Sequence, residues 1–96
     1  MDVTHITPAD GNVFADLGLD DAENLRLRAQ LMIEVKRFVE DSGLKQREAA
    51  KAMGTTETRL SEILHGRIEK CTIDRLVNML AQVGRHVRLA VDTKAA

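Results

Sequence analysis

Four glycines constrain the fold of this chain more than any other feature of its sequence. Each follows a stretch in which apolar residues recur at helical spacing; they are Gly43, Gly54, Gly66 and Gly84. Glycine adopts the left-handed conformation that closes a helix without steric cost, so it commonly marks a helix end. The sequence therefore predicts four helices, over residues 20–42, 46–53, 56–65 and 73–83.

The predicted helix starts carry capping signals. Asp20-Asp21-Ala22-Glu23 resembles a capping box, and threonines stand at or near the first positions of the third and fourth helices. The apolar residues expected to form the core are Leu31, Met32, Val35, Phe38, Val39, Ala49, Ala50, Met53, Leu60, Ile63, Leu64, Ile73, Leu76, Val77, Leu80 and Val83.

The apolar period changes after the fourth helix. Val87, Leu89 and Val91 alternate with other residues, which is typical of a strand with one buried face. No second strand is evident in the sequence, so the simplest partner is the same strand of a second copy around a two-fold axis. Alternatively, this tail lies against its own helices or is disordered. Three segments result: a flexible leader at 1–19, a helical domain at 20–84 and a dimerisation strand with tail at 85–96.

Composition places the chain among small globular domains. Its 96 residues are 44% hydrophobic and 30% charged, with two aromatic residues and one cysteine. Its longest stretch without Asp, Glu, Lys or Arg, from Leu76 to Gly84, is too short to span a membrane. No signal peptide is visible, and a single cysteine cannot form an internal disulfide. We therefore expect a cytoplasmic protein with no membrane partner.

Catalytic and metal-binding patterns are lacking. His5, His65 and His86 show no metal-ligand spacing, and Cys71 has no nearby Cys or His partner. We see no phosphate-binding glycine loop, catalytic triad or paired-carboxylate arrangement. The sequence therefore predicts no enzyme activity, no metal and no cofactor.

The strongest motif lies between residues 46 and 65. Small Ala50 stands where two helices would cross closely, Gly54 supplies the turn, and Leu60 and Ile63 anchor the second helix on the first. This is the helix-turn-helix pattern, in which the second helix enters the major groove of DNA.

These residues resemble phage-repressor or Cro-like (XRE-type) helix-turn-helix regulators. The resemblance rests on Gly43-Leu44-Lys45-Gln46, Glu48-Ala49-Ala50, Met53-Gly54-Thr55-Thr56, Arg59-Leu60-Ser61 and Leu64-His65-Gly66. Residues 12–18, 28–31 and 76–91 look like the HigA-like antitoxin branch. The chain departs from the family at Lys45, where a Thr is common, and at Thr55, where Ile or Val is common. The resemblance implies an all-α, lambda-repressor-like helix-turn-helix bundle with a short C-terminal strand.

The resemblance also implies roles for individual side chains, which agree with their charges. The expected base-reading residues on the second motif helix are Glu57, Thr58, Arg59 and Ser61, with Arg59 the best candidate for a guanine. The expected phosphate ligands are Lys45, Gln46, Arg47, Lys51, Thr56, Arg67 and Lys70. The expected dimerisation residues are Val87, Leu89 and Val91.

Plainer roles compete with several of these assignments. Glu57 near a helix N-terminus also complements the helix dipole. Arg59 has possible ion-pair partners in Glu57 and Glu62, and Lys45, Arg47 and Lys51 also fit an ordinary solvated face.

Charge is unevenly distributed along the chain. The first 24 residues hold six acids and no Lys or Arg, whereas the remainder is basic on balance. Antitoxins of the HigA-like branch neutralise a basic RelE/HigB-like toxin, and an acidic segment with apolar side chains would complement such a surface. The residues expected to bind this partner are Val13, Phe14, Asp16 and Leu17; a solubilising tail is the simpler interpretation.

The predicted function is a homodimeric repressor that binds an inverted-repeat operator in double-stranded DNA, neutralises a toxin and regulates its own operon. Two alternatives remain open. One is a stand-alone phage-type repressor without a toxin, and the other is a helical protein-interaction module that does not bind DNA.

Overall fold

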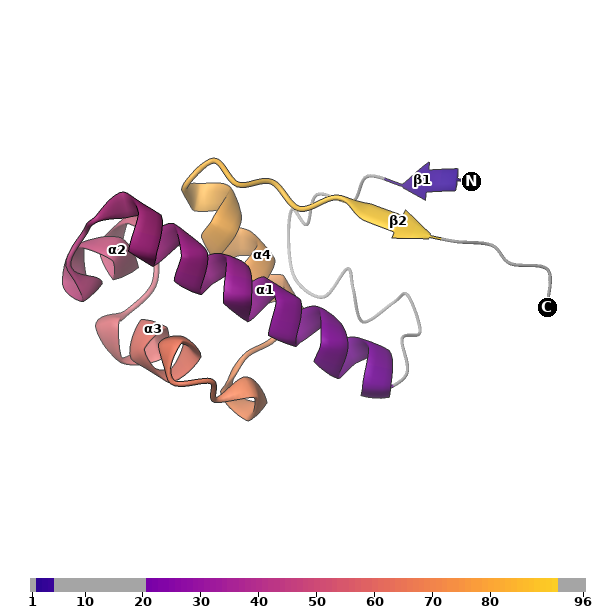
Figure 1. Ribbon diagram of the computed structural model, residues 1–96, viewed down its shortest axis with the longest axis horizontal. Coiled ribbons are helices and arrows are strands. Elements are labelled where there is room, and N and C mark those ends of the chain that lie inside the picture. Colours follow the sequence, from indigo (N-terminus) through magenta and orange to yellow (C-terminus); the bar gives the residue numbers. More distant parts are fainter. Residues whose placement is uncertain (1, 5–20, 92–96) are drawn as a thin grey trace.

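The computed structural model describes residues 2–4 and 21–91, which form a helical bundle with a short two-stranded ribbon (Figure 1). Its elements are β1 (Asp2–Thr4), α1 (Asp21–Ser42), α2 (Gln46–Ala52), α3 (Glu57–Leu64), the 3₁₀ helix η2 (Ile68–Lys70), α4 (Ile73–Gln82) and β2 (Leu89–Val91). The four α-helices confirm the predicted all-α bundle, and η2 was not predicted.

Helix ends follow the local signals in the sequence. Each predicted helix starts and ends within one residue of its observed bounds, and all four closing glycines have positive φ, between 68° and 79°. Thr56 and Thr72 are the N-caps of α3 and α4, where their hydroxyl oxygens accept hydrogen bonds from backbone N–H groups. Capping of this kind satisfies donors that the first helical turn cannot pair internally.

A single core lies where α1 crosses the other helices. Figure 1 shows the long α1 running past α2, α3 and α4, and its most extensive contacts are with α4. The buried apolar residues are Leu31, Met32, Val35, Ala49, Ala50, Met53, Leu60, Ile63, Cys71, Ile73, Leu76, Val77, Met79 and Leu80. Most of these were predicted. Cys71 and Met79 were not, and Phe38, Val39, Leu64 and Val83 are only partly buried at the core's edge.

The C-terminal ends of α1 and α4 are joined by polar contacts. The Arg85 guanidinium lies 5.4 Å from the centroid of the Phe38 ring, and its Nη2 is 3.5 Å from Asp41 Oδ2. Val87, a little further along, packs against the core. The segment after α4 therefore returns along the bundle, as one of the sequence alternatives described.

The strand ribbon corrects the sequence analysis at two points. β1 pairs antiparallel with β2, with Asp2 opposite Val91 and Thr4 opposite Leu89. The expectation of a flexible leader is therefore wrong for residues 2–4, and the chain itself supplies the partner strand that was not evident in the sequence. Three residues are too few for an alternating pattern to be recognised, which is why the sequence did not reveal β1.

Candidate nucleic-acid interface

Helices α2 and α3 form a tight helix-turn-helix unit. Ala50 is 2% exposed at the helix contact, and its carbonyl accepts a hydrogen bond of 2.9 Å from the Thr55 N–H across the turn. Gly54 has φ of +72°, which a residue with a Cβ adopts only with strain. The sequence reasoning on both residues is thus consistent with the geometry.

The first turn of α3 presents a row of polar side chains to solvent. Thr56 Oγ1 accepts from Arg59 N at 3.1 Å, and Glu57, Thr58 and Arg59 are all exposed. Leu60 directly after them is fully buried and anchors the helix. A recognition helix that reads the major groove needs an exposed first turn and a buried residue that anchors it on the core.

Ser61 differs from the other three expected base readers. It is partly buried, and its Oγ lies 3.3 Å from Nδ1 of His65, one turn further along α3. That nitrogen also lies 2.7 Å from the Ser61 carbonyl oxygen. Ser61 is therefore less available to a ligand than Glu57, Thr58 and Arg59 are.

The start of α2 lies against the start of α3. Gln46 Nε2 donates to the Glu57 carbonyl oxygen at 3.5 Å, and Arg47 Nε is 3.6 Å from Glu57 Oε2. The side chains of Arg47 and Glu57 are 87% and 52% exposed, so their ion pair is well solvated and weak. These contacts bring predicted phosphate ligands and a predicted base reader into one surface.

Lys45 precedes α2 as its N-cap but supplies no side-chain cap, because an ammonium group has no acceptor. Instead, the Glu48 carboxylate accepts from the Lys45 backbone N–H at 3.1 Å. The Lys45 side chain is exposed, as are those of Lys51, Arg67 and Lys70. These exposed cations suit either phosphate binding or solvation.

Arg67 precedes η2 and Lys70 is its last residue, and α1 holds that segment in place. Arg28 Nη1 donates to the carbonyl oxygens of Ile68 at 3.1 Å and Cys71 at 3.2 Å. A charged donor bridging two carbonyls across forty residues of sequence fixes the loop on the bundle. No such role for Arg28 was expected from the sequence.

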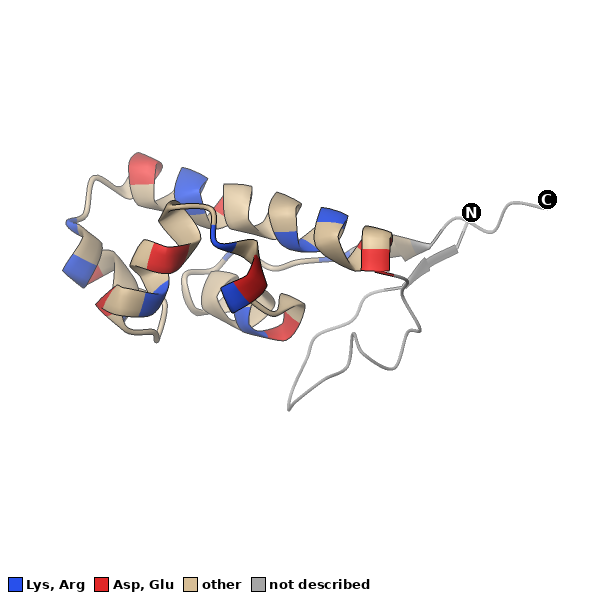
Figure 2. Ribbon diagram, turned by 90° about the horizontal axis from the view of Figure 1, so that it is seen from below, with Lys and Arg blue, Asp and Glu red and all other residues tan. Residues whose placement is uncertain are grey.

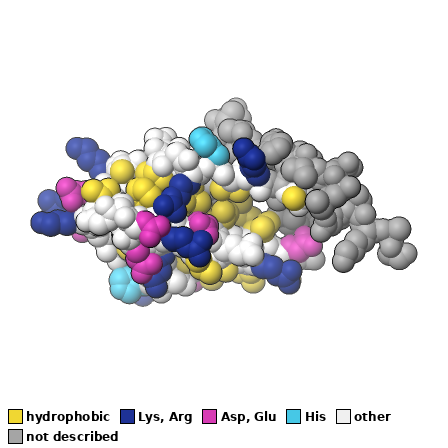
Figure 3. Space-filling view, turned by 45° about the horizontal axis from the view of Figure 1, so that its top comes forward, with side chains coloured by type: hydrophobic (Ala, Val, Ile, Leu, Met, Phe, Trp, Pro, Cys, Tyr) yellow, Lys and Arg dark blue, Asp and Glu magenta, His cyan; other side chains and the backbone are white. Residues whose placement is uncertain are grey.

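Charge on this part of the molecule is mixed. Figure 2 shows basic and acidic residues interspersed over the helices, and Figure 3 shows both signs side by side on one face. Residues 44–70 hold six basic and four acidic side chains. Recognition of an anionic partner here depends on a few placed side chains more than on bulk charge.

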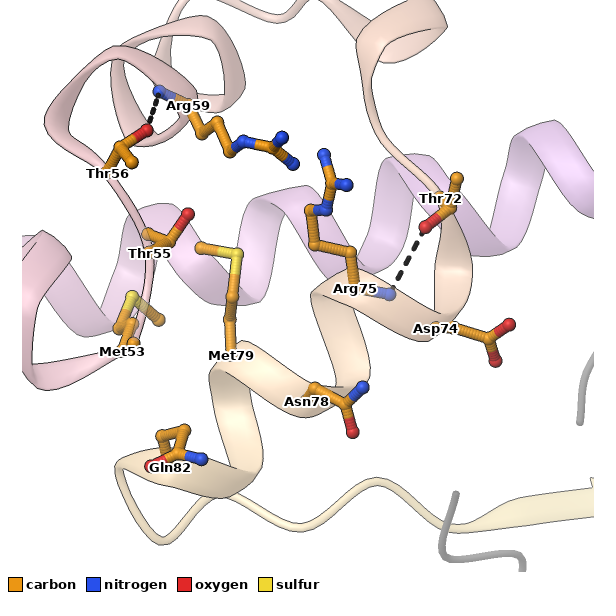
Figure 4. Close-up of a pocket in the computed structure, with 11 residues that line it drawn as sticks. Met53, Thr55, Thr56, Arg59, Thr72, Asp74, Arg75, Asn78, Met79 and Gln82 are labelled. Atoms are coloured by element: carbon orange, nitrogen blue, oxygen red, sulfur yellow. Dashed lines mark hydrogen bonds between the residues drawn. The ribbon is translucent and has the colours of Figure 1, made fainter. Parts of the chain in front are cut away.

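A groove between α3 and α4 brings in residues that the sequence analysis missed. Arg59 and Thr56 line it from α3, and Arg75, Asn78 and Gln82 line it from α4 (Figure 4). A signal for Arg75 was present, because Thr72-Ile73-Asp74-Arg75 repeats the Thr-x-x-Arg spacing of Thr56-Glu57-Thr58-Arg59. The alternative role of Arg59, an ion pair with Glu57 or Glu62, is not seen in the described residues, where Glu57 pairs with Arg47.

Several predicted residues lie elsewhere. Val13, Phe14, Asp16 and Leu17 fall outside the described residues. Leu89 and Val91 belong to β2, and Val87 lies before it, partly buried against the core.

The described residues, 2–4 and 21–91, were also compared with the requirements of a metal site and of a reactive thiol. No group of three His, Cys, Asp or Glu side chains is placed there to hold a metal. Burial raises the pKa of the Cys71 thiol, and nearby Glu62 raises that pKa further, which keeps the thiol protonated at neutral pH. Among the described helices, none has the length and apolar character needed to cross a membrane.

Comparison with known proteins agrees with this geometry. Residues 13–92 match the model of a family described as a helix-turn-helix domain, which covers most of the chain. No characterised protein matched the sequence significantly. The chain therefore belongs to this helix-turn-helix family, whose fold indicates a DNA-binding regulator.

Proposed function

We propose that this protein is a sequence-specific repressor that binds DNA through the first turn of α3. The observation that carries the proposal is the exposed row Glu57-Thr58-Arg59, capped by Thr56 and seated on buried Leu60. Glu57 accepts from a cytosine amino group, and Thr58 contacts a neighbouring base edge. Ser61 stands at the margin of this base-reading surface.

Phosphate contacts flank the base-reading surface. Thr56 caps α3. The other proposed phosphate ligands lie on or just before α2 and η2; they are Lys45, Gln46, Arg47, Lys51, Arg67 and Lys70. Gln46 is already directed toward the start of α3 through its bond to the Glu57 carbonyl. Cations on both sides of a recognition helix match the two phosphate backbones that border the major groove.

The repressor acts as a homodimer on an inverted repeat, with half-sites about 34–36 Å apart. In the described residues β2 pairs with β1 along one edge, which leaves its other edge open to the β2 of a second copy. Val87, Leu89 and Val91 are the proposed dimerisation residues. This arrangement would form a four-stranded sheet around the two-fold axis.

We further infer that the protein is the antitoxin of a toxin–antitoxin pair, of the XRE-type, HigA-like branch, and represses its own operon in the cytoplasm. The acidic character of residues 1–24 supports this role, because a RelE/HigB-like toxin is a basic protein. Val13, Phe14 and Leu17 supply apolar burial in that complex, and Asp16 supplies charge.

The DNA-binding proposal is tested by an electrophoretic shift with the DNA upstream of the gene, at low and moderate salt. A shift that survives competition by unrelated DNA is the expected result. Binding that any duplex competes away equally would contradict sequence-specific repression. No binding at either salt concentration would favour the protein-interaction module, with which the mixed surface charge is compatible.

The antitoxin proposal is tested by co-expression with the adjacent gene. A variant with Ser at positions 13, 14 and 17 keeps residues 2–4 and the DNA-binding domain, and it should lose toxin neutralisation while still shifting DNA. Full neutralisation by this variant would show that the leader does not bind the toxin. A neighbouring gene that encodes no small basic protein would favour the stand-alone repressor.

A further inference from the structure

The groove between α3 and α4 has the size and lining of a binding site. It is a groove wide open to solvent, with a volume of about 570 Å³, which is within the range of small-ligand sites. Its walls come from the α2–α3 turn, the first turn of α3 and one side of α4. Its polar lining includes Thr55, Thr56, Thr72, Asn78 and Gln82 in addition to two arginines. Most of these groups can donate hydrogen bonds.

The two arginines face each other across the groove. Figure 4 shows the guanidinium groups of Arg59, from α3, and Arg75, from α4, directed toward one another. The ion pairs found in the described part of the chain involve Arg37, Arg47 and Arg85, so no carboxylate there lies within 4.0 Å of either group. Two like charges held toward the same space create a positive potential that favours an anion.

The two capping threonines line the groove at the backbone end of each arginine (Figure 4). Thr56 Oγ1 accepts from Arg59 N at 3.1 Å, and Thr72 Oγ1 accepts from Arg75 N at 3.2 Å. Because each oxygen is used as an acceptor, each hydroxyl proton remains free to donate to a ligand.

Asp74 is an acidic residue in the lining of this groove. It is 9% exposed, and its Oδ1 has no hydrogen-bond partner. Figure 4 shows its carboxylate directed away from Arg59 and Arg75. It therefore forms no ion pair with either guanidinium group.

We propose that this groove binds a phosphate group, held between the planar guanidinium groups of Arg59 and Arg75. A phosphate offers several acceptor oxygens, which suits two arginine forks better than a single carboxylate does. The inference deepens the proposed function: Arg59 then binds a phosphate instead of a guanine, and the DNA contact extends onto α4. The same chemistry also fits a free phosphorylated molecule.

The first test uses inorganic phosphate as the probe, at constant ionic strength, with the arginine Nε–Hε resonances as the readout. Saturable shifts are expected for Arg59 and Arg75 and none for exposed Arg26 on α1. Arg75→Ala should weaken phosphate binding about tenfold or more, Arg75→Lys should weaken it less, and Arg26→Ala should leave it unchanged. A thermal melt of each variant checks that it is folded.

The second test measures duplex binding across a range of salt concentrations. If the phosphate belongs to DNA, Arg75→Ala and Arg59→Ala each weaken binding to all sequences equally and lower the salt slope by about one. Phosphate binding without this effect on DNA identifies a free phosphorylated ligand. If the variants weaken duplex binding but the wild-type protein does not bind free phosphate, the ligand of this groove is a phosphate of the DNA backbone.

Two outcomes would overturn the inference. One is an Arg75→Ala variant that leaves both phosphate binding and the salt slope unchanged. The other is an Arg59→Ala variant that loses sequence preference at a single base pair, because Arg59 would then contact a base and not a phosphate. If no variant and no wild-type protein binds DNA but phosphate still shifts both arginines, the proposed function fails and this site stands.

Discussion

Helices α3 and α4 begin alike and are used differently. Each starts with a threonine whose hydroxyl oxygen accepts from the N–H of an arginine three residues later, at 3.1 Å in α3 and 3.2 Å in α4. In both, the fourth helical residue is a fully buried leucine, Leu60 or Leu76. The cap therefore sets where each helix starts and how it is anchored, and it does not set the role of the helix.

The difference lies in the two residues after the cap. In α3 these are Glu57 and Thr58, which are exposed, whereas in α4 they are Ile73 and Asp74, which are buried. Because α4 packs along α1, most of its surface is covered. The buried face of α4 therefore holds the bundle together and leaves Arg75 at the groove, whereas three successive residues in the first turn of α3 are exposed to a ligand.

The largest effect is expected at the first helical position of α4. Ile73→Ala removes buried apolar atoms and should lower the free energy of unfolding by about 2–5 kcal/mol. The matched change in α3, Glu57→Ala, should alter it by less than about 0.5 kcal/mol. Urea denaturation measures both, and equal losses would break the division of roles between the two helices.

The next effect concerns DNA. Glu57→Ala should weaken binding to the specific operator by about 1–3 kcal/mol, because a base contact is lost. Removing a negative charge by itself favours DNA binding, so the direction of the change in affinity distinguishes the two roles of Glu57. Tighter binding in a titration with operator DNA would mean that Glu57 only restrains Arg47.

A smaller effect is expected at the two N-cap threonines, and it should be the same for both. Thr56→Ala and Thr72→Ala should each lower the free energy of unfolding by about 1 kcal/mol, since the two capping bonds have nearly the same length. Thermal or urea unfolding gives both values. If the losses of unfolding free energy in the two variants differed by much more than about 1 kcal/mol, the two helix starts would not be equivalent.

The smallest effect concerns the residues that precede the caps, partly buried Thr55 and buried Cys71. Burial raises the Cys71 pKa above its ordinary value, so the thiol favours folding while it is protonated. The contribution of this thiol to stability should therefore be constant below the unfolded thiol pKa and be lost as pH rises through the folded one. Cys71→Ala should remove this slope, whereas Thr55→Ala should retain it; identical pH profiles for wild type and Cys71→Ala would contradict the assignment.

Much of the fold could be predicted because its signals are local. The threonine caps and the closing glycines act within one or two turns, and the apolar spacing of Leu76, Val77 and Leu80 reports one helix face. The exposure of Glu57, Thr58 and Arg59 followed from the same reasoning. The candidate site was harder to predict from the sequence, because the α4 residues that face α3 were expected only in the core or had no expected role.

The amino-acid sequence by itself determined where the helices begin and end, because capping and turn formation depend on residues a few positions apart. Tertiary packing alone decided that Arg28 bonds carbonyls in the η2 segment, that β1 pairs with β2 across the length of the chain, and that Arg75 faces Arg59. Each of these contacts joins segments distant in sequence. Their geometry depends on how the helices cross, which no local pattern encodes.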